Sequence, residues 1–278
     1  MLTAFLTYAL LMHAHGRFRA RRPWLLVGAA LVVAVLCALL ATRPWDPLQT
    51  PADASGGKAA AQASGSAPLV LRPGERVLVF GDSWVYGSAA IRPTLGFAYL
   101  LADKLDVHTI VAGVRGSGYL KPGIDGPAYG ARIAALDPSL DPELIIVEGS
   151  INDRHRYPTG YRAAVTSAWN ALAAKYPKAQ IVILGPAPQV LPVEPATAKI
   201  DTTLRELAAA RSWPYLSPIA EKWITPANYL DVIDTSRTAS NHPSTAGHAY
   251  LADRVAADLR KLERAPVVAA EGSPSPTP

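Results

Sequence analysis

The sequence predicts an α/β protein in which helices cover both faces of a parallel β-sheet. Short apolar runs rich in β-branched residues alternate with longer helical patterns between residues 69 and 264. Four of the runs are apolar at almost every position, as expected of strands that are buried on both faces. Glycine-rich and polar segments follow the runs, and ligands bind at these strand ends in sheets of this kind.

The expected strands are short and follow one another at regular intervals. Each consists mainly of valine, isoleucine and leucine, and the fifth has the weakest pattern. Strands that are separated by helical segments are joined by right-handed crossovers, so we expect them to run parallel. The expected strands are residues 77–80, 109–112, 144–147, 181–184 and 215–216.

The helical segments lie between these strands and after the last one. The final segment has the clearest pattern, because Leu251, Val255 and Leu259 recur at a spacing of four residues and form one apolar face. Such a face packs against a sheet. The expected helices are residues 97–105, 129–136, 161–175, 196–211 and 245–262.

A membrane anchor is expected before this domain. Residues 24–41 contain no charged side chain, and their length is at the lower limit for a membrane-spanning helix. Four arginines precede the run and only Arg43 follows closely, which places residues 1–23 in the cytoplasm and the domain outside. A cleaved signal peptide has the same charge order and would give a secreted protein. We expect an uncleaved anchor because no A-x-A cleavage site follows the run.

The segments that flank the domain have the composition of flexible chain. Residues 42–68 include ASGGKAAAQASGSAP and show no apolar periodicity, which is typical of a tether. Residues 265–278 end in GSPSPTP and are expected to be a disordered tail. The globular domain is therefore expected to span residues 69–264.

Composition argues against several classes of partner and cofactor. The formal net charge is +5, but much of the excess lies in the arginines before the apolar run, and the domain is nearly balanced. We therefore expect no nucleic-acid partner. Cys37 is the only cysteine, which rules out an intrachain disulfide and a cysteine-based zinc site. No histidine spacing or phosphate-binding glycine loop predicts a metal or another cofactor.

A serine stands in a glycine turn at the end of the first expected strand. Gly81-Asp82-Ser83-Trp84 directly follows residues 77–80. A serine hydroxyl in such a turn becomes a nucleophile when a neighbouring base removes its proton. The alternative is a plain strand-to-helix turn in which Asp82 or Ser83 caps the helix.

A candidate base lies near the end of the domain. His242 precedes Pro243 and an expected helix, so its imidazole stands on a rigid segment at a helix start. The alternative is a surface histidine near a helix N-terminus. His248 falls inside the helical pattern and is expected to pack or to cap.

Two further positions are candidate oxyanion donors. Gly116 offers a backbone N–H group and Asn152 offers a side-chain amide, and such groups stabilise the negative charge that develops during acyl transfer. The alternatives are a loop glycine and an Asx turn or helix cap formed by Asn152 and Asp153.

Taken together and in order, these motifs resemble the SGNH/GDSL hydrolase superfamily. That family has a GDS serine, a glycine after the second strand, a G-x-N-D block after the third and a D-x-x-H block near the C-terminus. The corresponding residues here are Gly81-Asp82-Ser83, Gly116, Ser150-Ile151-Asn152-Asp153 and Ala239-Ser240-Asn241-His242.

The resemblance implies a flavodoxin-like three-layer α/β/α fold and hydrolysis of esters through an acyl-enzyme. By the same resemblance Ser83 is the nucleophile and His242 is the base. The oxyanion hole would consist of Ser83 N–H, Gly116 N–H and Asn152, with Asp82 and Asp153 in support.

The sequence departs from the family pattern at two positions. Ser150 replaces a glycine, which would narrow the pocket or add a hydroxyl to it. Ala239 replaces the aspartate that orients the histidine and stabilises its charged form. Three alternatives follow: Asp234 or Asp231 takes the place of that aspartate, a backbone carbonyl or Asn241 holds Nδ1 in a Ser-His dyad, or the enzyme is weak or inactive.

These features lead to one main hypothesis and two alternatives. The main hypothesis is a membrane-tethered extracytoplasmic serine esterase that acts on small acyl esters, such as O-acetyl groups on glycans. One alternative is an O-acyltransferase in which a sugar hydroxyl intercepts the same acyl-enzyme. The other is a degenerate, non-catalytic carbohydrate-binding module, for which Trp84, Tyr86 and Tyr119 near the site could stack on a sugar.

Overall fold

The computed structural model describes residues 68–263. The predicted cytoplasmic segment 1–23, anchor 24–41 and tail 265–278, and nearly all of the predicted linker, lie outside the described residues. Within residues 68–263, no helix is both long and apolar enough to cross a membrane.

The centre of the domain is a five-stranded sheet in which every pairing is parallel. The strand order is β2-β1-β3-β4-β5, so the chain moves outward from β1 to β2 and then returns to the other side of β1. The order therefore reverses between β1 and β3, and this is the place where open α/β sheets bind ligands. The strands are β1 (Arg76–Gly81), β2 (His108–Gly113), β3 (Leu144–Glu148), β4 (Gln180–Leu184) and β5 (Tyr215–Leu216).

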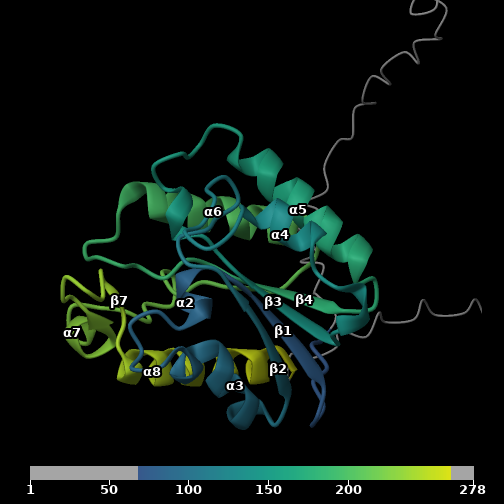
Figure 1. Cartoon of the computed structure of the whole chain (residues 1–278), viewed down its shortest axis with the longest axis horizontal. Coiled ribbons are helices and arrows are strands. Elements are labelled where there is room, and N and C mark those ends of the chain that lie inside the picture. Colours follow the sequence, from purple (N-terminus) through teal and green to yellow (C-terminus); the bar gives the residue numbers. More distant parts are fainter. Residues whose placement is uncertain (1–67, 264–278) are drawn as a thin grey trace, which may run out of the picture. The chain divides into compact units, whose positions relative to one another are not determined.

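Helices cover both faces of the sheet, which gives three layers (Figure 1). Alternate side chains of β1 point to opposite faces, so Val77 and Val79 belong to one apolar core while Leu78 and Phe80 belong to the other. Helices α3 (Phe97–Leu105) and α8 (Thr245–Glu263) cover the first core, and α4 (Tyr129–Ala134), α5 (Tyr161–Lys175) and α6 (Pro195–Ala209) cover the second.

The sequence prediction of an α/β fold with a parallel sheet is confirmed, and most boundaries agree within two residues. The expected helix at 129–136 ends earlier, at Ala134. After Ala134 the turn tightens, since the N–H of Leu136 donates to the carbonyl of Ile133, three residues earlier, at 3.2 Å. The expected helix at 196–211 instead begins at Pro195, a residue that is well suited to the first helical position.

Several short elements were not predicted. The most important is a small antiparallel pair, β6 (Ile233–Asp234) and β7 (His242–Pro243), which carries the candidate base. The others are short helices or single turns: α2 (Ser83–Tyr86), α7 (Tyr229–Val232), η1 (Pro93–Leu95), η2 (Pro138–Leu140) and η3 (Ile151–Asp153).

Candidate active site

The candidate nucleophile lies at the turn from β1 into α2. β1 ends at Gly81, and Ser83 is the first residue of α2. The Asp82 carboxylate caps the helix by accepting the Trp84 N–H at 2.9 Å. Gly87 ends the helix in the left-handed conformation, with φ of +89°. The chain therefore reverses sharply on both sides of the serine and leaves its hydroxyl at the carboxyl edge of the sheet.

The candidate base contacts this hydroxyl directly. Nε2 of His242 lies 2.8 Å from Oγ of Ser83, and Nδ1 lies 2.7 Å from the carbonyl oxygen of Ala239. A carbonyl oxygen can only accept, so Nδ1 carries a hydrogen and donates it. In the neutral ring, Nε2 is then left with a lone pair that can accept the Ser83 proton.

Among the described residues, neither Asp231 nor Asp234 forms a hydrogen bond with the imidazole of His242, whose partners are the Ala239 carbonyl and Ser83. Asp234 is opposite His242 in the β6–β7 pair, but its carboxylate accepts the N–H of Ser236 at 2.8 Å. This hydrogen bond lowers the pKa of the Asp234 carboxyl. The sequence left three arrangements open for the partner of Nδ1. The structure has the one in which a backbone carbonyl, that of Ala239, accepts its hydrogen.

The candidate oxyanion donors gather beside the serine. Gly116 has φ of +71°, a conformation that suits glycine, and it lines the same cavity as Ser83 and Asn152. Among residues 68–263, the N–H groups of Ser83 and Gly116 donate to no other residue. Two backbone donors are therefore available to a substrate oxygen.

The side-chain amide of Asn152 is already engaged. Its Nδ2 lies 2.8 Å from Oδ2 of Asp82 and 3.0 Å from the carbonyl oxygen of Ser117. These contacts fix the direction of the amide, and a third acceptor would have to share one of its two hydrogens.

A second buried carboxylate holds the loop that contains Gly116. Asp153 is fully buried and accepts the backbone N–H groups of Tyr119, Leu120 and Lys121 at 2.7 to 3.1 Å. Burial raises the pKa of Asp153, and the three hydrogen bonds oppose that rise. A Cβ on Gly118 would lie 2.5 Å from the Asp153 carboxylate, so glycine is needed for this approach.

The replacement of glycine by Ser150 does not narrow the pocket. Ser150 is fully buried, it is not among the residues that line the cavity, and its hydroxyl donates to the carbonyl of Ser117 at 3.1 Å. The added hydroxyl therefore holds the loop at Ser117 from its buried side, away from the cavity.

The aromatic candidates also separate into different roles. Trp84 and Tyr119 are buried, and Tyr119 accepts a hydrogen bond from the indole of Trp169 at 2.8 Å. Tyr86 lines the cavity, with the Arg115 guanidinium 5.4 Å from the centre of its ring. Of these three aromatic residues, Tyr86 alone lines the cavity and could stack on a sugar.

Sequence reasoning missed Arg132. This buried arginine on α4 donates to the carbonyl of Gly81 and the hydroxyl of Ser117, both at 2.8 Å, and also to the carbonyl of Ala112. Its guanidinium lies 4.2 Å from the ring centre of Phe80. It thus ties together the ends of β1 and β2, from which the Ser83 and Gly116 turns emerge. A signal existed, because residues 129, 132, 133 and 136 fall on one face of the predicted helix.

The site opens into a cavity of about 510 Å³. This volume lies within the range of small-molecule sites, which is roughly 300–1,000 Å³. Ser83, Gly116, Asn152 and His242 all contribute to its wall, and no acidic side chain of residues 68–263 does. The residues that the sequence placed at three strand ends and at one helix start thus meet at one cavity.

Comparisons with known proteins agree with this geometry. Residues 79–250 match the GDSL-like lipase/acylhydrolase family. A GDSL lipase from Mycobacterium tuberculosis is 26% identical over 190 residues, which are 65% of this chain and 79% of the relative.

Two solved structures share the fold at low sequence identity. A carbohydrate acetylesterase family member from Sinorhizobium meliloti is 16% identical with a TM-score of 0.53, and the match covers 68% of this chain and 99% of that one. A two-domain esterase active on acetylated mannans is 17% identical with a TM-score of 0.54, and the match covers 69% of this chain and 50% of that one.

The family match covers more than half of the chain and spans all the motifs from β1 to α8. The chain therefore belongs to the GDSL-like lipase/acylhydrolase family and is an SGNH-type serine hydrolase that acts on ester bonds.

Proposed function

We propose that the protein is a membrane-tethered extracytoplasmic esterase that removes small acyl groups, of the O-acetyl type, by a Ser-His dyad. The observation that carries the mechanism is the 2.8 Å contact between Ser83 Oγ and His242 Nε2. The contact between Nδ1 and the Ala239 carbonyl supports a dyad, because it fixes the reactive tautomer without a carboxylate.

The reaction proceeds through an acyl-enzyme. Ser83 Oγ attacks the ester carbonyl while His242 Nε2 takes its proton, and the N–H groups of Ser83 and Gly116 stabilise the oxyanion with help from Asn152. The imidazolium then returns the proton to the departing alcohol. Water attacks the acyl-enzyme, His242 takes a proton from it and gives that proton back to Ser83, and the carboxylic acid leaves.

The location and the glycan substrate have separate support. The uncharged run at 24–41, with arginines before it, favours an anchor with the domain outside the cytoplasm. A carbohydrate acetylesterase family member and an esterase active on acetylated mannans share the fold, which favours acetylated polysaccharide as a substrate class.

The mechanism can be tested by measuring hydrolysis of p-nitrophenyl acetate by the full chain in detergent solution. Ser83→Ala should abolish release of p-nitrophenol, whereas Ser139→Ala, an exposed serine on η2, should not change it. Unchanged activity in Ser83→Ala would refute the assignment. Failure of a fluorophosphonate to label Ser83, together with glycan binding, would instead indicate the binding module.

Acetylated glycans test the substrate. We expect free acetate as the product, whereas transfer of acetyl to an added glycan acceptor would indicate the acyltransferase. An alkaline phosphatase fused to the C-terminus should be active if the domain is outside the cytoplasm, and an inactive fusion would contradict the proposed topology.

A further inference from the structure

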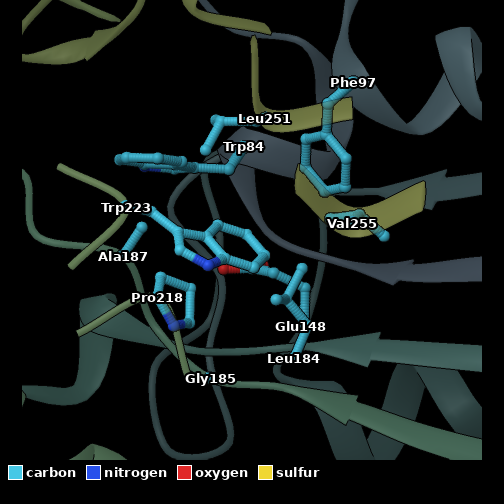
Figure 2. A pocket seen from close by; sticks show the side chains of 10 residues that line it. All are labelled: Trp84, Phe97, Glu148, Leu184, Gly185, Ala187, Pro218, Trp223, Leu251 and Val255. Carbon is cyan, nitrogen blue, oxygen red and sulfur yellow. The ribbon is translucent and has the colours of Figure 1, made fainter. Parts of the chain in front are cut away.

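The acidic side chain of Glu148 lies next to the turn that carries Ser83, on the side away from the substrate cavity. It is the last residue of β3 and only 4% of its surface is exposed. Figure 2 shows it among the side chains that line a small cavity, together with Trp84, Trp223 and Leu184. The cavity volume is about 10 Å³ and the other lining residues are uncharged. This space holds one water at most, so the carboxyl is almost completely removed from solvent.

The carboxyl group of Glu148 contacts the residue before the nucleophile. The backbone N–H of Asp82 donates to Oε2 of Glu148 at 3.1 Å, and each carboxyl group influences the pKa of the other. A Cβ on Gly81 would lie 2.6 Å from Oε2, so the contact depends on glycine at that position. β1 and β3 are neighbours in the sheet, and this contact joins their ends where the strand order reverses.

Two buried carboxyl groups in contact cannot both carry a charge at little cost. The Asp82 carboxylate already accepts the N–H of Trp84 and the amide of Asn152, and both hydrogen bonds favour its charged form. Burial raises the pKa of both carboxyl groups, but that of Glu148 rises well above its usual range, and the charge of Asp82 raises it further. The proton of the pair therefore resides on Glu148.

The other polar groups around the pair are few. The positive charge of Arg132 on α4 lowers the pKa of both carboxyl groups, and His242 on β7 lowers that of Asp82. The Tyr129 hydroxyl donates to the backbone carbonyl of Glu148 at 3.1 Å. On the cavity side, α3, β4, α8 and the segment 218–223 contribute apolar side chains and the indole of Trp223.

We propose that Glu148 is a positioning residue that remains a neutral acid and donates its hydroxyl hydrogen to Asp82, so that the Asp82 carboxylate holds the amide of Asn152 in place. The neutral acid suits both contacts, because its carbonyl oxygen accepts the Asp82 N–H while its hydroxyl donates. In this role the proton of Glu148 stays in place while the proton of Ser83 moves to His242 and back. The inference rests on the proposed function only for the role of Asn152 toward the oxyanion.

Two substitutions in the full-length protein separate this role from simple packing. Glu148→Gln keeps one acceptor and one donor, so its kcat for p-nitrophenyl acetate should stay close to wild type at neutral pH. Glu148→Met keeps the volume but loses both groups, so kcat should fall by about 10²-fold through loss of alignment, with KM little changed. Melting curves establish that each variant is folded. A Glu148→Gln variant as impaired as Glu148→Met, or a fully active Glu148→Met, would overturn the proposal.

An infrared measurement tests the protonation without reference to activity. At neutral pH, the difference spectrum of wild type minus Glu148→Gln should contain the carbonyl band of a protonated carboxylic acid. Glu206→Gln on α6 is the control, because Glu206 is exposed and pairs with Arg162, and it should give no such band. Absence of the Glu148 band would refute this inference. If the wild-type protein shows the Glu148 band but hydrolyses no ester substrate, the proposed function is refuted and this inference is not.

Discussion

The two residues of the proposed dyad, Ser83 and His242, are supported in different ways. On the side of Ser83, buried carboxylates accept hydrogen bonds from distant parts of the chain: Asn152 reaches Asp82 across 70 positions, and Asp153 holds a loop more than 30 positions away. On the side of His242, the imidazole is held by the carbonyl of a residue three positions earlier. The nucleophile is thus positioned by the tertiary structure, whereas the base is positioned by the local path of the chain.

The local path on the side of the base is unusual. Ser240 and Asn241 have φ values of +52° and +57°, which non-glycine residues adopt at a cost. The turn brings the Ala239 carbonyl back to the imidazole three residues later. The following variants test how far the two sides differ.

The largest loss is expected from removing the base. His242→Ala should reduce kcat by roughly 10⁴- to 10⁶-fold, because the hydroxyl of Ser83 then has no group to take its proton. The measurement is steady-state hydrolysis of p-nitrophenyl acetate. Since the two residues act as a unit, the double variant with Ser83→Ala should lose little more than either single variant. Additive losses would show that they act separately.

Removing the amide on the side of the nucleophile should have the next largest effect. Asn152→Ala should reduce kcat by roughly 10²- to 10³-fold with KM little changed, as expected for an oxyanion donor. Asn170→Ala, at an exposed position on α5, is the control and should leave kcat unchanged. An active Asn152→Ala would mean that this amide only supports Asp82 and Ser117.

The link between the two sides gives a prediction about stability. His248 on α8 accepts the N–H of Phe97 at Nδ1 and contacts the carbonyl of Ser88 through Nε2, so it fastens the loop after α2 to the helix after the base. Burial lowers the pKa of His248 to about 4. The unfolded chain binds this proton near pH 6.5, so the folded state loses stability as the pH falls from 6.5 to 4.

The size of this effect is about 3 kcal/mol between pH 7 and pH 4. Urea unfolding of the full chain at several pH values measures it. His248→Asn cannot titrate, so its free energy of unfolding should be lower than that of wild type at pH 7 but fall less steeply toward pH 4. Parallel curves for the two proteins would refute the assignment.

The smallest effect is expected from adding an acidic residue on the side of the base. Ala239→Asp should raise kcat by about tenfold at most, because a hydrogen bond to a charged group exceeds a neutral one by about 1 kcal/mol and Nδ1 already has an acceptor. Asp234→Asn is the matched control and should change little, since Asn can still accept the N–H of Ser236. A large loss in Asp234→Asn would show that Asp234 is the partner of His242.

The sequence predicted the sheet well because its strands are buried on both faces. Residues 77–80, 144–147 and 181–184 are apolar throughout, and no turn or surface helix produces that pattern. Parallel strands then bring the segments that follow them to one edge, so Ser83, Gly116 and Asn152 could be placed together before any coordinates were known. The pair β6–β7 was missed because Ile233-Asp234 and His242-Pro243 show neither an apolar run nor a sustained apolar-polar alternation.

The roles of Arg132 and Glu148 and the support of His242 could not be predicted, because they depend on contacts that residue types alone do not indicate. Arg132 and Glu148 are charged residues within or next to apolar patterns, and their partners are backbone groups or a carboxyl distant in sequence. The support of His242 is a carbonyl, which every residue possesses. The sequence therefore left a backbone carbonyl as one of three alternatives for Nδ1, and no residue type chose among them.

The Ala239 carbonyl also has a consequence for how the site can vary over evolution. A side-chain partner can be deleted by one codon change, but a main-chain oxygen survives every replacement of its own side chain. Residue 239 is therefore free to drift as far as packing allows. Selection acts instead on Ser240 and Asn241. Their left-handed conformation directs the carbonyl at His242, a task that an aspartate side chain performs in a triad.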